Sequence, residues 1–354
     1  MFTIRRWGMT QPMYSLFTAS VDARPVPPVG PGDCKLVVML PALNEERTIG
    51  NVISRIPKQI PGIAIIESLV VNDASIDNTE AVAITQGATV VSHRRRVGLG
   101  TVFQTGLDHA LRSDADIIVS IDADGQFDAC HIPTLIRPIL DGEAGLVTAT
   151  RFANPEFTPQ MPAVKLWGNR WVTRIVNVIT GKRFTDTCCG FRAYSRDAAL
   201  RLTLFARFTY TQETLIDAAF KGIEIAEIPI QVRGEREHGT SRIAASLWRY
   251  AVQSGCILLL AARDHRPLHL FGIPGVVLVG LGVGVEFFMI NGNRGSSSSA
   301  LDQTLRFIMG AALTGGMLLC VASLLADMIR RTRTIMEATY YLVRRDANRK
   351  SDSE

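Results

Sequence analysis

Two aspartates stand one residue apart directly after a short apolar run, in the stretch IIVSIDADGQ at residues 117–126. The run predicts a strand buried on both faces, which ends where Asp122, Asp124 and Gly125 begin a turn. Side chains at positions i and i+2 of an extended chain project to the same side, so both carboxylates can reach one hard cation. Gln126 adds a neutral oxygen. The stretch therefore predicts either a metal site open to phosphate or an ordinary solvated turn.

Two further polar segments follow predicted strands earlier in the chain. PALNEE begins at residue 41 and VNDASIDNT at residue 71, each directly after an apolar run. In open α/β sheets, ligands bind beyond the carboxyl ends of the strands, so these loops and the aspartate turn are expected to share one crevice. We also expect Asn44 to cap a helix that begins at Glu45. Three polar strand ends favour a nucleotide bound through its base, its ribose and a metal-bridged diphosphate.

Other nucleotide-binding and metal-binding patterns fit poorly. Gly98, Gly100 and Gly106 do not have the spacing GxGxxG, and the sequence contains no GKS or GKT, which disfavours a Rossmann dehydrogenase and a P-loop nucleotidase. The six cysteines show no CxxC spacing, which indicates a reducing compartment. Cys188 and Cys189 are adjacent, which disfavours an ordinary disulfide between them. Two neighbouring cysteines alone also make a poor zinc site.

The elements that must position these residues follow an alternating pattern. From Lys35 to about Thr150, short apolar runs alternate with longer amphipathic ones, which predicts βαβ units around a mostly parallel sheet. Residues 1–33 contain several prolines and no apolar run long enough for a signal peptide, so a flexible cytosolic arm is expected there. Strands are expected at residues 36–40, 65–71, 89–91, 117–121 and 145–149.

The C-terminal third is far more apolar. Two stretches, about 268–290 and 307–328, are each long enough to cross a hydrocarbon core, and together they predict a helical hairpin at 267–329. Arginines precede and follow the pair, so the positive-inside rule places both ends in the cytoplasm, with a cytoplasmic tail at 330–354. An interfacial amphipathic helix is expected at 244–266, with a domain-packing helix as its alternative. Gly280 and Gly284 permit close packing within the hairpin or between subunits of a homo-oligomer.

Charge narrows the classes of partner. The formal net charge is +5, which suits an anionic membrane surface or a phosphorylated substrate. The tight basic run at residues 94–96 has no interleaved aromatic residues, so we expect no nucleic-acid partner.

In combination, the motifs resemble the family 2 glycosyltransferases with a GT-A fold. The resemblance runs from about Lys35 to Ile243 and is carried, in order, by VVMLPALNEERTIG, VVNDASIDNT, GLGTVFQTGLDHA, IDADGQFDACHIPTL, TATRF, GNRWVTRIVNVITG, DTCCGFRAYSR and HGTSRI. It is closest in kind to the branch that transfers sugars to polyprenyl phosphates, typified by dolichol-phosphate mannose synthase and bactoprenol glucosyltransferases. It implies an α/β, Rossmann-like GT-A domain at 34–243 with a mostly parallel sheet.

The resemblance also implies roles for individual residues. Positions that match the family's contacts to the nucleotide sugar are Pro41, Leu43, Glu45, Asp73 and Asp122. The family's metal and diphosphate site, which takes Mg²⁺ or Mn²⁺, corresponds to Asp122, Asp124 and Gln126. Positions that match the catalytic region around the sugar and the acceptor phosphate are Arg151, Arg170, Asp186 and Arg192, with Asp186 expected to orient a partner or to act as a base.

The implied activity is inverting transfer of a single hexose from a UDP- or GDP-sugar to dolichyl or undecaprenyl phosphate. The implied location is the cell membrane, with two spans and a cytoplasmic catalytic domain. One alternative is a family 2 enzyme that acts on another membrane lipid or a polysaccharide, although a processive synthase would be expected to show QxxRW and more spans. A non-catalytic nucleotide-binding scaffold is a further alternative, and the intact Asp122, Asp124 and Gln126 argue against it.

Overall fold

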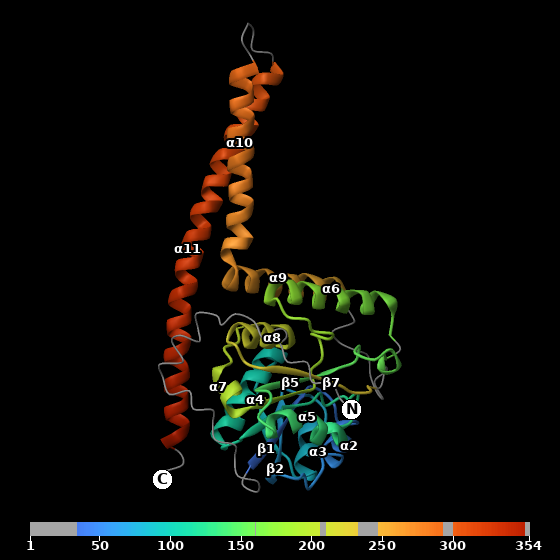
Figure 1. Ribbon diagram of the computed structural model, residues 1–354. Coiled ribbons are helices and arrows are strands. Elements are labelled where there is room, and N and C mark those ends of the chain that lie inside the picture. Colours follow the sequence, from blue (N-terminus) through green and yellow to red (C-terminus); the bar gives the residue numbers. More distant parts are fainter. Residues whose placement is uncertain (1–33, 160, 206–209, 233–246, 293–299, 351–354) are drawn as a thin grey trace. The chain divides into compact units, whose positions relative to one another are not determined.

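The computed structural model describes residues 34–159, 161–205, 210–232, 247–292 and 300–350 (Figure 1). Within it, residues Leu259–Met336 form one compact unit and the remaining described residues form the other, which we call the catalytic unit. The expected N-terminal arm, the HGTSRI segment and the first residues of the expected interfacial helix lie outside the described residues.

The catalytic unit contains a seven-stranded sheet in the order β3-β2-β1-β4-β6-β5-β7. β6 is antiparallel to both of its neighbours, and the other pairs are parallel. The strands are β1 (Cys34–Ala42), β2 (Ile63–Asn72), β3 (Thr89–Ser92), β4 (Ile117–Ser120), β5 (Leu146–Thr150), β6 (Arg192–Ser195) and β7 (Ile225–Pro229). The five predicted strands and the mostly parallel sheet are confirmed. β6 and β7 were not expected from the sequence.

Helices connect the strands, as the βαβ pattern predicts. α4 buries Phe103, Leu107 and Leu111 on one face, and Gly106 on the same side brings the helix close to β1. A Cβ at Gly106 would clash with the buried side chain of Met39, so a larger residue would force Met39 or the helix to move. The helices are α2 (Ile49–Ser54), α3 (Thr79–Thr85), α4 (Leu99–Arg112), α5 (Ile132–Leu140), α6 (Ala163–Thr180), α7 (Arg196–Arg201), α8 (Thr211–Phe220) and α9 (Leu247–His265).

The helix after β1 begins later than expected. α2 starts at Ile49, and Asn44 is not its cap: Asn44 has a left-handed backbone with φ of 50°. Its side-chain oxygen accepts a hydrogen bond from the backbone N–H of Ile76 at 2.9 Å. The prediction of a helix capped by Asn44 is therefore wrong, because the amide ties two loops together instead of closing a helix end.

The second unit consists mainly of two apolar helices. A π-helical turn at Leu268–Gly272 leads into α10 (Ile273–Gly292), and α11 spans Ala300–Lys350. By length and composition, Leu268–Phe288 and Gln303–Asn348 are the described helices able to cross a membrane. This fits the predicted hairpin.

Close packing between α10 and α11 uses other glycines than the two expected. A Cβ at Gly275 would lie 2.8 Å from the Sγ atom of Cys320, and one at Gly316 would lie 2.8 Å from the Gly275 carbonyl oxygen. At Gly280 and Gly284 a Cβ would meet no heavy atom of the described residues within 4 Å. The helices therefore approach through Gly275 and Gly316, which allow the two backbones to touch.

The residues expected to form a cytoplasmic tail, 330–354, begin as a continuation of α11. The helix continues to Lys350, and its last turns pack on the catalytic unit. Tyr341 donates a hydrogen bond from its hydroxyl to Asp197 Oδ1 at 2.8 Å, and Arg344 Nη1 donates to the Leu200 carbonyl at 3.3 Å. An aromatic and a basic residue thus hold the end of the helix against α7 and the residues that follow it.

Candidate active site

Hydrogen bonds join the loops at the carboxyl ends of β1, β2 and β4. The backbone N–H of Asn44 donates to Ser75 Oγ at 2.9 Å, and that of Glu45 donates to Thr79 Oγ1 at 2.8 Å. Thr48 Oγ1 donates to the Ala123 carbonyl at 2.8 Å, which connects the first loop to the aspartate turn. The three polar segments therefore lie beside one another, as the sheet topology requires.

The aspartate turn packs against a segment almost 70 residues further along the chain. A Cβ at Gly190 would lie 2.9 Å from Asp122 Oδ2 and 3.2 Å from the Tyr210 hydroxyl. Tyr210 donates to the Gly190 carbonyl at 3.1 Å, and its hydroxyl lies 3.0 Å from Ser120 Oγ. Ser120 and Tyr210 were not singled out from the sequence. They hold Gly190 against the carboxylate of Asp122, which only a residue without a side chain permits.

The two carboxylates suit an open metal site more than a closed one. Asp124 is 4% exposed, and its Oδ1 accepts from the backbone N–H of Gln126 at 3.1 Å, which fixes the turn. No group of three or more His, Cys, Asp or Glu side chains in the described part of the chain is arranged to hold a metal ion. Mg²⁺ is commonly bound by one or two carboxylates together with substrate phosphates and water. Asp122 and Asp124, with the space that Gly190 keeps clear, fit that pattern.

We expect Gly190→Ala to lower the rate of the sugar transfer that the resemblance implies roughly 10²-fold, because the new methyl group displaces the carboxylate of Asp122. The rate is measured with labelled donor on purified protein. Gly168→Ala is the matched control, since its Cβ would meet no heavy atom of the described residues within 4 Å. Equal rates for the two variants would show that Asp122 does not need this space.

Asp73 fixes a loop in addition to its expected role. Its Oδ1 accepts from the N–H of Val97 at 2.7 Å and its Oδ2 from that of Gly98 at 3.2 Å. The carboxylate is 6% exposed and so clamps the connection between β3 and α4 onto the end of β2. Contacts of the nucleotide with Asp73, Pro41, Leu43 and Glu45 stay predictions.

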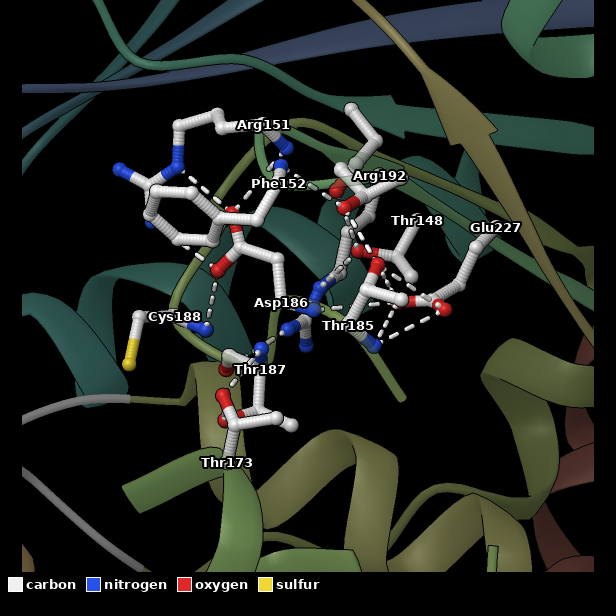
Figure 2. A network of polar contacts seen from close by, with 12 residues as sticks. Thr148, Arg151, Phe152, Thr173, Thr185, Asp186, Thr187, Cys188, Arg192 and Glu227 are labelled. Atoms are coloured by element: carbon white, nitrogen blue, oxygen red, sulfur yellow. Dashed lines mark hydrogen bonds and ion pairs between the residues drawn. The ribbon is translucent and has the colours of Figure 1, made fainter. Parts of the chain in front are cut away.

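Arg151 and Asp186 form a buried ion pair (Figure 2). Arg151, just after β5, donates from Nε to Asp186 Oδ2 at 2.6 Å and from Nη2 to Oδ1 at 3.0 Å. The N–H of Cys188 also donates to Oδ1, at 3.0 Å, and Asp186 is 0% exposed. Both carboxylate oxygens are thus engaged in a geometry that suits orientation. It does not suit proton abstraction, the other role expected for Asp186.

Glu227 on β7 binds the backbone next to this pair and was not singled out from the sequence. Its carboxylate accepts from the N–H groups of Thr185 at 3.0 Å and Asp186 at 3.2 Å (Figure 2). Burial, together with the charge of Asp186, raises the pKa of Glu227 to about 7, although these hydrogen bonds favour the ionised form. The sequence signal was a single acidic residue inside the strand IAEIP.

A raised pKa at Glu227 predicts a stability that depends on pH. Its usual pKa is 4.5, so between about pH 4.5 and 7 the folded protein binds the proton more tightly than the unfolded chain does. The contribution of this group to the free energy of unfolding therefore falls as the pH rises through that window. We expect Glu227→Gln to flatten the decline, measured as melting temperature from pH 4.5 to 8 in one detergent. An unchanged slope would contradict the raised pKa.

Arg192 is fully buried beside the site. It is 0% exposed, with Nε donating to Thr148 Oγ1 at 3.2 Å and Nη2 donating to the Thr187 carbonyl at 3.2 Å. Nη1 donates to the Thr211 carbonyl at 2.6 Å and to Thr214 Oγ1. We therefore revise the expected contact with the sugar: these bonds make Arg192 a positioning residue that joins β5, β6 and α8.

Arg170 is exposed on α6, the helix that holds the Asp186 segment. Thr173 on the same helix lies 3.1 Å, oxygen to oxygen, from Thr187, one residue after Asp186 (Figure 2). Among the described residues, no hydrogen bond or ion pair joins Arg170 to Arg151 or Asp186, so its expected contact with the acceptor phosphate stays a prediction.

Comparison with known proteins gives consistent results. The profile described as "Glycosyl transferase family 2" matches residues 37–203. The UDP-N-acetylglucosamine–dolichyl-phosphate N-acetylglucosaminyltransferase of Methanococcus voltae is 30% identical over 219 residues, covering 56% of this chain and 86% of the relative. A dolichyl-phosphate hexose transferase of Haloferax volcanii is 29% identical over 198 residues, covering 56% of this chain and 82% of the relative.

A solved structure shares the fold of the catalytic unit. Glucosyl-3-phosphoglycerate synthase of Mycobacterium tuberculosis, in complex with Mn²⁺, UDP and glucosyl-3-phosphoglycerate, aligns with a TM-score of 0.52 and 27% identity. The alignment covers 73% of this chain and 86% of the synthase.

Proposed function

Because this chain belongs to glycosyltransferase family 2, we propose that it transfers a single sugar from a nucleoside-diphosphate sugar to a polyprenyl phosphate. The observation that carries the proposal is the placement of Asp122 and Asp124 just after β4, with the carboxylate of Asp122 against Gly190. The names of the relatives from Methanococcus voltae and Haloferax volcanii support a lipid-phosphate acceptor. The manganese and UDP in the mycobacterial synthase support a metal-dependent nucleotide-sugar donor.

Each part of the site has a distinct task in this proposal. Asp122 and Asp124 would hold Mg²⁺ or Mn²⁺, which supplies positive charge to the departing diphosphate. The acceptor phosphate is already ionised near neutral pH, so it needs to be positioned more than deprotonated. Asp186 holds the guanidinium of Arg151 in a fixed orientation, and Arg151 and Arg170 are proposed to attract the acceptor phosphate.

The test is direct transfer in membranes. Membranes that contain the protein are incubated with labelled UDP- and GDP-sugars, and the label is followed into an organic extract, with membranes lacking the protein as the control. We expect a mild-acid-labile lipid product whose amount rises when polyprenyl phosphate is added. Label found only in polymer or in another lipid would favour the alternative acceptors, and no transfer from any donor would favour a non-catalytic scaffold.

We also propose that the catalytic domain and both chain ends are cytoplasmic. Arg263 and Arg266 precede the first apolar helix, and Arg330, Arg331 and Arg333 lie at the end of the second apolar stretch, which fits the positive-inside rule. A cysteine at Ser297, between the helices, is expected to react with an impermeant thiol reagent from the non-cytoplasmic side only, relative to the unsubstituted protein. Labelling from the cytoplasmic side alone would contradict the two-span topology.

A further inference from the structure

We propose that α6 rests on the bilayer surface through one apolar face of the helix. The α6 apolar face consists of five side chains whose exposed fractions run from 36% to 70%: Val164, Trp167, Trp171, Ile175 and Val178. Their spacing of three or four residues places them in one stripe along the helix. The two tryptophan rings touch edge to face, with centroids 5.7 Å apart. Five large apolar side chains in one exposed stripe form a docking surface.

The opposite face of α6 is buried inside the described part of the chain. Asn169, Thr173, Val176 and Ile179 are its buried residues. Thr173 contacts Thr187, and Asn177 exchanges two hydrogen bonds with Phe184, at 2.8 and 2.9 Å. Burial of the inner face therefore explains the helix itself, but leaves the exposed stripe without a role inside the described part of the chain.

Charge favours a lipid surface as the partner. Residues 163–183 contain three lysine and arginine residues on the helix and two just after it, but no aspartate or glutamate: Lys165, Arg170, Arg174, Lys182 and Arg183. Basic residues beside an apolar stripe match anionic headgroups above acyl chains. Tryptophan is the side chain most typical of this boundary, because its ring is apolar and its N–H is polar. The same chain carries two helices of membrane-spanning length.

A second copy of the chain is a poorer partner for this face. A symmetric dimer would bring the same patch of each subunit together and so oppose two sets of positive charges. An anionic bilayer meets the same charges with attraction. We therefore assign the face to lipid, and a change of oligomeric state becomes an outcome that would overturn the assignment.

The two faces of α6 link the lipid surface to the site. The inner face holds residues Phe184 and Thr187, on either side of Asp186. If the proposed function is right, docking of α6 brings the segment that orients Arg151 to the level of lipid headgroups. This consequence rests on the proposed function, whereas the docking itself does not.

Depth-dependent fluorescence tests the docking without any assay of activity. The full-length protein is placed in vesicles that contain anionic lipid and acyl chains brominated near the headgroup. Trp7 and Trp248 are replaced by phenylalanine, so that emission comes only from Trp167 and Trp171. A control protein lacks all four tryptophans and carries Ile84→Trp, at an exposed apolar position on α3. We expect clearly stronger quenching of the α6 pair, whereas quenching no stronger than in the control would overturn the proposal.

A second experiment measures how the α6 apolar face affects the apparent KM for the acceptor. The double variant Trp167→Ser, Trp171→Ser is expected to raise the apparent KM for polyprenyl phosphate in vesicles roughly tenfold, equivalent to about 1.4 kcal/mol, and to leave the KM for the nucleotide sugar unchanged. Ile84→Ser is the matched control. A double variant that changes from dimer to monomer, together with quenching of the α6 pair no stronger than in the Ile84→Trp control, would identify a subunit interface instead. Strong quenching in a protein that transfers no sugar to lipid would refute the proposed function and leave the docking intact.

Discussion

Asp124→Asn is expected to lower sugar transfer roughly 10²–10³-fold while the protein still folds. The substitution keeps an oxygen that can accept from the Gln126 N–H and removes the negative charge proposed to hold a divalent ion beside the diphosphate. Initial rates are measured with labelled donor over a range of Mn²⁺ and Mg²⁺ concentrations, and folding is checked by thermal melting.

Asp141→Asn is the control for the loss of a surface charge. Asp141 is exposed, and in the contacts described its side chain pairs only with Arg137, one helical turn away. It should leave the rate unchanged. Full activity of the unsubstituted enzyme in EDTA, or of Asp124→Asn without added metal, would remove the metal from the proposed mechanism.

The strands β1, β4 and β5 were predictable because they are buried on both faces. β1 reads as an almost unbroken apolar run, and its residues Leu36 to Leu40 are nearly all fully buried. β6 was not predicted because it begins with Arg192, whose charge is buried among threonine and carbonyl oxygens. A sequence pattern contains no information about such distant oxygens.

The candidate site was only partly predictable for the same reason. The pattern at Asp122 and Asp124 is local and could be recognised, but the fit of Gly190 against Asp122 depends on β6 lying between β4 and β5. Glu227 likewise reaches Asp186 only because β7 pairs with β5. Local patterns therefore identified the chemical groups, and the topology determined which of them meet.

The sequence also could not predict which side of an apolar helix faces its neighbour. α10 is apolar on all sides, so no stripe marks the side that faces α11, and Gly280 and Gly284 were as plausible as Gly275. The structure selects Gly275 through its contact with Cys320 and Gly316.

Asp186→Asn is expected to destabilise the catalytic unit by about 3–5 kcal/mol, because it leaves the guanidinium of Arg151 largely buried without its counter-charge. Unfolding is followed by denaturant titration in detergent. If Asp186 orients Arg151, the guanidinium loses its fixed position in Asp186→Asn. The rate of sugar transfer should then fall together with the free energy of unfolding.

The double variant Asp186→Asn, Arg151→Gln separates the two effects. Removing both charges leaves no unpaired ion, so much of the lost stability should return, whereas transfer should stay low because the oriented guanidinium is gone. If Asp186 were instead a general base, its replacement by asparagine would lower transfer far more than the loss of stability explains, because the reaction would lose its proton acceptor. A single variant that melts like the unsubstituted protein would therefore contradict the orienting role, and recovery of transfer in the double variant would show that Arg151 does not act on the substrate.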